Sequence, residues 1–332
     1  MTTLCTIYRF LKTVVILLFA LTLSACDNAE KPSDQWESAV QGHYTAALSS
    51  DGKYGIVGSI QHGASLWDMQ RKERLFNLNH AKGQFTLLSA AAFSPEGRYA
   101  ATASDRTIVL WEVATGEPVW FWTSPGDILG MALTPNGDYA ALALDNHTAV
   151  LFDIKNGGVK RTFNHNEKVR SIAISADGSH LLTGSDDFIA RLWDIQSAEV
   201  LKSWRHENNV ITTALSDDGR YAFTAAQADQ ANIWDTNSGK QLSTLPIKKG
   251  SYIMGAAYTV ARFSSNGQKL MTGTNSQLVQ LWDVKTAKQL KRWRISKKEQ
   301  WKPTSAAVLA VAFRGNNRYV AIGSNGLSYK LQ

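Results

Sequence analysis

Short apolar segments alternate with polar turn signals along most of the chain, most clearly between His165 and Ile195. The segments there are rich in Ile, Leu, Val and Thr and partly alternate with polar residues, and they span residues 170–174, 180–185 and 189–195. Such segments predict β-strands. Asp177-Gly178 separates the first two, and both residues tolerate the left-handed backbone of a hairpin turn. The stretch therefore predicts a small antiparallel meander that cannot bury both of its faces alone.

This unit repeats along the chain. Its hairpin turn recurs as Asp51-Gly52, Glu96-Gly97, Asn136-Gly137, Asp177-Gly178, Asp218-Gly219, Asn266-Gly267 and Asn316-Asn317. An aromatic–acid pair ends six of the units, as Trp67-Asp68, Trp111-Glu112, Phe152-Asp153, Trp193-Asp194, Trp234-Asp235 and Trp282-Asp283. Successive pairs are 44, 41, 41, 41 and 48 residues apart, a period typical of propeller blades. From these pairs the chain resembles the WD-repeat β-propeller family over roughly residues 34–332.

The resemblance implies an all-β fold, a seven-bladed β-propeller of WD repeats with four strands in each blade. Six units are followed by a segment that can form the fourth, outer strand, whereas the seventh unit, residues 309–331, is not. Trp36–Val40 lies where an outer strand would precede the first unit, so we expect it to complete the last blade. Closing the ring in this way would remove a bare sheet edge that could otherwise promote aggregation.

Composition fits one large domain, which we place at residues 35–332. The chain has 332 residues, of which 44% are hydrophobic, and a formal net charge of +7. Its two cysteines, Cys5 and Cys26, are not in a CxxC spacing. A disulfide scaffold or a cysteine metal site is therefore not expected.

The N-terminus has the pattern of a secretion signal. Arg9 and Lys12 precede an uncharged apolar run that is too short to span a membrane, and the run ends at Leu23-Ser24-Ala25-Cys26. These four residues resemble the lipobox of bacterial lipoproteins. The resemblance implies that residues 1–25 are a signal peptide and that Cys26 carries the lipid attachment. An uncleaved membrane anchor is the alternative.

A lipid on Cys26 would tether the protein to a membrane of the bacterial cell envelope, facing the periplasm. Asp27 resembles an inner-membrane retention signal, which favours that membrane. The polar segment 26–34 is interpreted as a flexible tether. Nucleic acid is not an expected partner behind a secretion signal, despite the basic charge.

Polar residues inside the fourth unit resemble the hydrogen-bonded network of a WD-repeat blade. The family pattern of His, Ser/Thr, Asp and Trp matches the positions His165, Ser185, Asp187 and Trp193. Blade 2 offers His80, Asp105 and Trp111 at similar spacing. The resemblance implies a structural role, because a buried imidazole or carboxylate needs a partner. The alternative is that His165 and Asp187 form an acid–base pair.

Loop length indicates where a partner would bind. From the aromatic residue of one unit to the polar residue before the next hairpin turn, the usual count is 23, but it is 27, 30 and 32 before units 2, 6 and 7. The extra residues fall in connections from an outer to an inner strand, which share one face of a propeller. The first insertion holds Lys82 and Phe85. The candidate partner-binding residues of the other two are Lys248, Lys249, Tyr252, Lys297, Lys298, Trp301 and Lys302.

Cations mixed with aromatic side chains suit an acidic peptide, an anionic glycan or lipid headgroups. A solvated basic loop without a partner is the alternative. A non-catalytic scaffold that binds a protein partner is the function we expect.

The sequence contains no nucleophile elbow, HExxH, phosphate-binding glycine loop or calcium-loop spacing. We therefore predict no catalytic residue, no metal ligand and no cofactor. The segment from Thr115-Gly116 to Trp120, after Glu112, resembles the tryptophan-docking pattern of quinoprotein-like propellers. That resemblance supports an alternative function, a periplasmic enzyme or binding protein for a small molecule or glycan.

Overall fold

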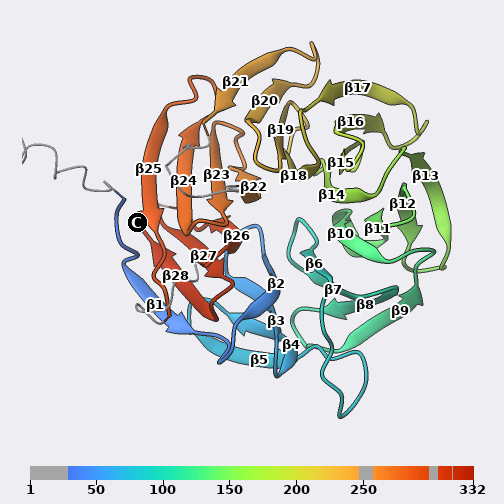
Figure 1. Cartoon of the computed structure of the whole chain (residues 1–332). Helices are drawn as coiled ribbons and strands as arrows, with labels where there is room; N and C mark the ends of the chain where they lie inside the picture. The colour runs from blue at the N-terminus through green and yellow to red at the C-terminus, as the bar shows by residue number, and fades with distance from the viewer. Residues whose placement is uncertain (1–28, 247–256, 299–305, 316) are drawn as a thin grey trace, which may run out of the picture.

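Seven antiparallel sheets of four strands each stand around a ring in the computed structural model, which describes residues 29–246, 257–298, 306–315 and 317–332 (Figure 1). The prediction of an all-β, seven-bladed propeller is confirmed. Blades 1 to 6 are β2–β5, β6–β9, β10–β13, β14–β17, β18–β21 and β22–β25, and blade 7 is β26–β28 with β1. A single 3-10 turn, η1 (Pro135–Gly137), is the helical element among the described residues.

Each blade runs from an inner to an outer strand. The inner strands are β2 (His43–Leu48), β6 (Ala90–Phe93), β10 (Ile128–Leu133), β14 (Val169–Ile174), β18 (Val210–Leu215), β22 (Tyr258–Phe263) and β26 (Val308–Phe313). The second strands are β3 (Tyr54–Ser59), β7 (Tyr99–Ser104), β11 (Tyr139–Leu144), β15 (His180–Ser185), β19 (Tyr221–Ala226), β23 (Lys269–Thr274) and β27 (Tyr319–Gly323).

The third and fourth strands lie progressively farther from the ring centre. The third strands are β4 (Gly63–Asp68), β8 (Thr107–Glu112), β12 (Thr148–Asp153), β16 (Ile189–Asp194), β20 (Ala231–Asp235), β24 (Leu278–Asp283) and β28 (Leu327–Leu331). The outer strands are β5 (Glu73–Asn77), β9 (Pro118–Thr123), β13 (Val159–Asn164), β17 (Val200–Arg205), β21 (Gln241–Leu245), β25 (Gln289–Arg294) and β1 (Asp34–Glu37).

The core lies between the blades rather than within any one of them. Phe163 of blade 3, for example, packs with Leu181 and Trp193 of blade 4 in one apolar cluster. Second strands are covered on both faces, which explains continuous apolar runs such as Tyr139–Leu144, where five of six residues are buried. Outer strands keep few buried residues, and Phe163 is the buried one of β13. Every blade therefore depends on its neighbours for burial.

The acidic residue of each aromatic–acid pair accepts hydrogen bonds that stabilise the turn after the third strand. Asp194 Oδ1 accepts hydrogen bonds from the backbone N–H of Ser197 at 2.7 Å and from its hydroxyl at 3.0 Å. These bonds to Ser197 hold the pKa of Asp194 below its usual value. Ala198, at the end of this turn, has φ +61°. The acid half of the repeat is thus explained by local backbone structure.

The N-terminus closes the ring, as predicted. β1 pairs antiparallel with β28, with Asp34 opposite Lys330 and Glu37 opposite Leu327. The strand begins and ends earlier than the predicted Trp36–Val40, because the N–H groups of Ser38 and Ala39 both donate to Gly326 O and lead the chain out of the sheet.

The chain is already bound to the propeller before β1 begins. Glu30 bridges the outer edge of β25, donating its N–H to Arg292 O at 2.8 Å and accepting from Arg294 N at 2.9 Å. Ser33 N then donates to Lys330 O at 2.9 Å. Residues 30–34 of the predicted flexible tether are therefore held against blades 6 and 7.

No helix in the part of the chain that the structure describes is long and apolar enough to cross a membrane.

Gly326→Ala should weaken ring closure. A Cβ on Gly326 would lie 2.0 Å from Ala39 O, and the residue has φ +86°. Gly315→Ala is the matched control, because Gly315 has φ +63° but its Cβ would meet none of the described atoms within 4 Å. We expect Gly326→Ala to lose at least about 2 kcal/mol more unfolding free energy than Gly315→Ala in urea titrations. Equal losses would contradict the closing contact.

Candidate functional site

One face of the ring carries the connections between outer and inner strands together with the turns between second and third strands. We call it the loop face. The long connections into blades 6 and 7 include residues 247–256 and 299–305, which lie outside the described residues. Five of the predicted partner-binding residues fall there, namely Lys248, Lys249, Tyr252, Trp301 and Lys302.

Lys298, which was predicted to bind a partner, contacts the closing strand. Its Nζ donates to Glu37 Oε1 at 2.7 Å and also to Val40 O. Lys297 lies half-buried beside it. Lys298 thus joins the connection into blade 7 to the N-terminal strand, so its charge contributes to ring closure.

An apolar patch lies on the loop face of blades 1 and 2. Its members are large side chains that are between 41% and 69% exposed, and they are Val40, Tyr44, Ile60, Phe85 and Leu87. We call these five residues the loop-face patch. Ile60 N donates to Gly42 O, and the rings of His62 and Phe85 meet edge to face with centroids 6.3 Å apart. The contact between His62 and Phe85 joins the turn after β3 of blade 1 to the connection into blade 2.

Hydrogen bonds accepted by Asn79 and Thr86 hold the connection that carries Phe85 and Leu87. Asn79 Oδ1 accepts hydrogen bonds from Ala64 N and Thr86 N, both at 3.0 Å. Thr86 Oγ1 in turn accepts from His80 N at 2.7 Å. Because Thr86 is held inward, Phe85 and Leu87 on either side of it face outward. The sequence indicated Phe85 but missed the other members, which come from separate segments.

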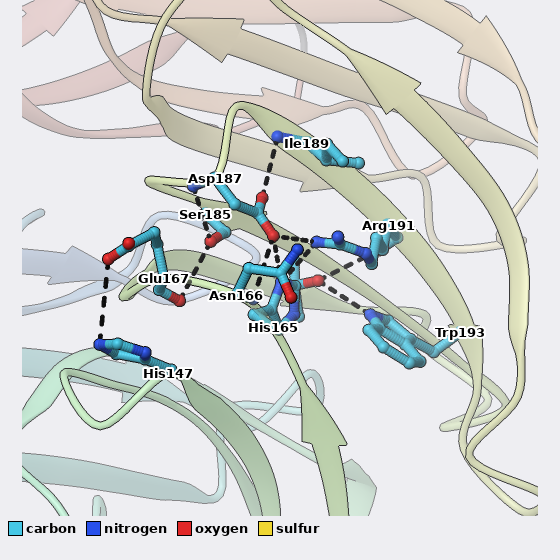
Figure 2. A network of polar contacts seen from close by, with 10 residues as sticks. His147, His165, Asn166, Glu167, Ser185, Asp187, Ile189, Arg191 and Trp193 are labelled. Atoms are coloured by element: carbon cyan, nitrogen blue, oxygen red, sulfur yellow. Dashed lines mark hydrogen bonds and ion pairs between the residues drawn. The ribbon is translucent and has the colours of Figure 1, made fainter.

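The buried tryptophan of blade 4 bonds a different hydroxyl from the predicted one. Trp193 Nε1 donates to Thr183 Oγ1 at 2.8 Å, whereas Ser185 Oγ donates to Glu167 O at 3.2 Å (Figure 2). Trp193 is paired with Leu181, and Thr183 and Ser185 follow on the same face of the strand. The indole N–H of Trp193 donates to Thr183, because Thr183 is nearer than Ser185 along that face. Thr183 therefore takes the hydrogen bond of the indole, whereas Ser185 Oγ accepts from Asp187 N at 3.2 Å.

An arginine lies between the histidine and the aspartate of blade 4. Arg191 Nη1 donates to Asp187 Oδ2 at 2.7 Å and to His165 Nδ1 at 2.8 Å (Figure 2). His165 Nδ1 and Asp187 Oδ2 are 3.9 Å apart. Burial lowers the pKa of His165 to about 4, with the Arg191 charge acting in the same direction. The neutral imidazole accepts from the guanidinium, which is a structural arrangement within the blade.

The threonine–tryptophan bond recurs in three other blades. Trp111 donates to Thr102, Trp234 to Thr224 and Trp282 to Thr272, at 2.8, 2.8 and 2.9 Å. His80 and His206 contact the same threonines in blades 2 and 5, each at 2.9 Å. A threonine nine or ten residues before the tryptophan is the sequence signal that would have found this contact.

Two cavities lie at the ends of the central channel, with volumes of about 340 and 320 Å³. Asp217 is the one carboxylate among the described residues that line them. Burial raises its pKa, and Arg262 opposes that shift. Arg262 Nη1 donates to Leu48 O at 3.0 Å, so this side chain spans from blade 6 to blade 1. No group of three His, Cys, Asp or Glu side chains is placed for a metal within the described ranges.

Trp120, on which the quinoprotein-like resemblance rested, is 42% exposed on the outer strand of blade 2. The tryptophan that contacts the next blade is Trp122. Its ring lies against Gly157, and its Nε1 donates to Ile154 O. Trp204 does the same in blade 4, donating to Gly239 O at 3.0 Å. Inter-blade packing thus accounts for Trp122 and Trp204.

The family model for the WD domain, G-beta repeat, matches residues 73–112 and 157–194. Each match begins at or just before the outer strand of one blade and ends with the third strand of the next. Together with the seven four-stranded blades in a ring, these two matches support a WD-repeat β-propeller family for the chain. This fold fits a protein-interaction scaffold.

Acid should destabilise the propeller through its buried histidines. Burial lowers the pKa values of His43, His80 and His165 to about 4, from 6.5 when unfolded. The unfolded chain then binds more protons below pH 6.5, so stability is complete above pH 6.5 and falls toward pH 4. Between pH 7.5 and 5 we expect a loss of roughly 1–2 kcal/mol for each histidine in urea titrations.

His165→Gln serves as the check on this assignment. The variant should lose about a quarter to a third of the difference in unfolding free energy between pH 7.5 and 5, because burial lowers the pKa of His206 as well. An unchanged pH dependence would show that this imidazole does not titrate as its burial requires.

Proposed function

We propose that this chain is a non-catalytic interaction scaffold, tethered to a bacterial membrane by lipid on Cys26, which binds a protein partner with its loop face. The loop-face patch is the observation that carries the proposal. Exposed aromatic and aliphatic side chains on a braced backbone can bury apolar area without much loss of conformational freedom. Singly exposed apolar residues are ordinary, but these five come from neighbouring segments of one face, and Phe85 contacts His62 of blade 1.

The connection into blade 2 also places Lys82 in solvent, and a partner with acidic groups around an apolar centre would complement it. Lys298 remains a proposed partner-binding residue, but it also bonds Glu37. Replacing it would disturb ring closure, so the patch gives the cleaner test.

Membrane attachment is proposed from the lipobox-like Leu23-Ser24-Ala25-Cys26. Acyl chains bury methylene groups at about 0.8 kcal/mol each, so two or more hold a protein stably at a bilayer. The proposed location is the periplasmic side of the cell envelope, with Asp27 favouring the inner membrane.

Cys26→Ser should move the protein from the membrane fraction to the soluble fraction of the periplasm, because it removes the proposed lipid attachment. Fractionation, with mass determination of the N-terminal peptide, would measure this. The wild-type peptide should carry acyl mass on Cys26. Recovery of the variant in membranes at the wild-type level would instead support an uncleaved anchor.

Substituting Phe85 and Leu87 together by Ser should reduce partner capture at least tenfold in cells by crosslinking and mass spectrometry. The matched control is Val119 and Phe121, both to Ser, on the outer strand of blade 2. Phe121 is 68% exposed and Phe85 is 69% exposed, so the two variants remove similar exposed surface. The control should capture the same proteins as wild type. Equal losses in both, or none in either, would contradict a partner site on the loop face.

A further inference from the structure

The chain joins the propeller at the outer rim of blade 6. Figure 1 shows the N-terminal segment meeting the ring beside β25. The first contacts there are the two backbone hydrogen bonds between Glu30 and β25. Asp34 then forms an ion pair with Lys72 at 2.7 Å as β1 begins. From Glu30 onward, the described chain therefore moves with the ring.

Because Glu30 is bound to the ring, only a short segment of chain separates the ring from the proposed lipid on Cys26. Four residue steps separate Cys26 from Glu30, and a fully extended chain covers at most about 3.6 Å per step, or roughly 14 Å. If Cys26 is acylated at the bilayer surface, the blade 6 rim must lie within that distance of the headgroups. A propeller about 40 Å across cannot then be held clear of the membrane at that edge.

The same rim is the most basic of the outer strands. Asp283–Arg294 contains five cations and one acid, whereas the equivalent Glu112–Thr123 of blade 2 contains two acids and no cation. Lys285 and Lys288 are exposed, and Lys291 is half-buried with its ammonium over the Trp293 ring. Lys31 of the N-terminal segment is also exposed.

One apolar side chain accompanies these cations. Leu290 is 41% exposed on β25, next to Lys291. Lysine side chains can lay their alkyl stems on a surface while their ammonium groups contact phosphate. Anionic lipids attract such groups by roughly fivefold in binding constant for each basic residue near the surface.

We propose that the blade 6 rim, defined as Lys31, Lys285, Lys288, Leu290 and Lys291, lies on anionic phospholipid headgroups. The propeller then stands on its edge on the membrane, and its loop face is directed sideways, open to a partner. This orientation rests on the proposed lipid attachment, whereas the affinity of the rim for anionic lipid is a property of the folded domain alone.

The affinity is tested with the processed, unlipidated chain, residues 26–332 carrying Cys26→Ser. Flotation is measured with vesicles of phosphatidylcholine alone and with about 30% phosphatidylglycerol. We expect binding to the anionic vesicles that weakens in about 0.5 M salt. Lys285→Glu, Lys288→Glu and Lys291→Glu together should reduce binding at least tenfold, with an unchanged unfolding midpoint.

The matched control reverses the same number of charges on other rims, with Lys160→Glu, Lys202→Glu and Lys240→Glu. It should bind within about threefold of the unsubstituted chain. Equal binding to neutral and anionic vesicles, or equal loss in both triple variants, would overturn the assignment of the rim. Because this chain has no lipid, its result is independent of the membrane attachment tested with Cys26→Ser in cells.

Orientation is tested on the lipidated chain in anionic vesicles, with fluorophores on Lys288→Cys or Glu117→Cys. A quencher attached to lipid headgroups should reduce emission several-fold more at position 288 than at position 117. Similar quenching at the two positions would overturn the edge-on arrangement even if the rim binds anionic lipid.

Discussion

Burial shared between neighbours is the constraint on which this structure depends. A four-stranded blade has two apolar faces and no core of its own, and each apolar cluster draws residues from adjacent blades. An open row of such sheets would leave one face bare at either end. Closing the ring covers the exposed faces of the first and the last sheet. The pairing of β1 with β28 therefore completes the hydrophobic core as well as one sheet.

The family matches are offset from the blades by one strand, and this offset explains the closure. A sequence repeat contributes its outer strand to one blade and its other three strands to the next. The ring can close only when a strand from one end of the chain joins strands from the other. Glu30, Lys298 and the carbonyl of Gly326 reinforce this junction from separate segments.

The sequence predicted blade number and ring closure because both follow from a periodic signal. Hydrophobic alternation could not predict where β1 ends. The strand ends where the N–H groups of Ser38 and Ala39 both donate to Gly326 O, which lies far along the chain. Nor could it separate Thr183 from Ser185, which share one face of a strand. Loop composition could not reveal that Lys298 bonds Glu37, because the two residues are 261 positions apart. The loop-face patch was largely missed for the same reason, as folding alone brings its segments together.

The long-range junction also has a consequence for the order of events during synthesis. Ser33 and Lys330 are 297 positions apart, so the strand that follows Ser33 emerges long before its partner β28. At about 5–20 residues per second, β1 waits roughly 15–60 s before β28 exists. Throughout that interval it is an unpaired strand, and the growing array offers it an exposed sheet edge. Shielding of this nascent segment by a chaperone would therefore favour productive folding over premature pairing.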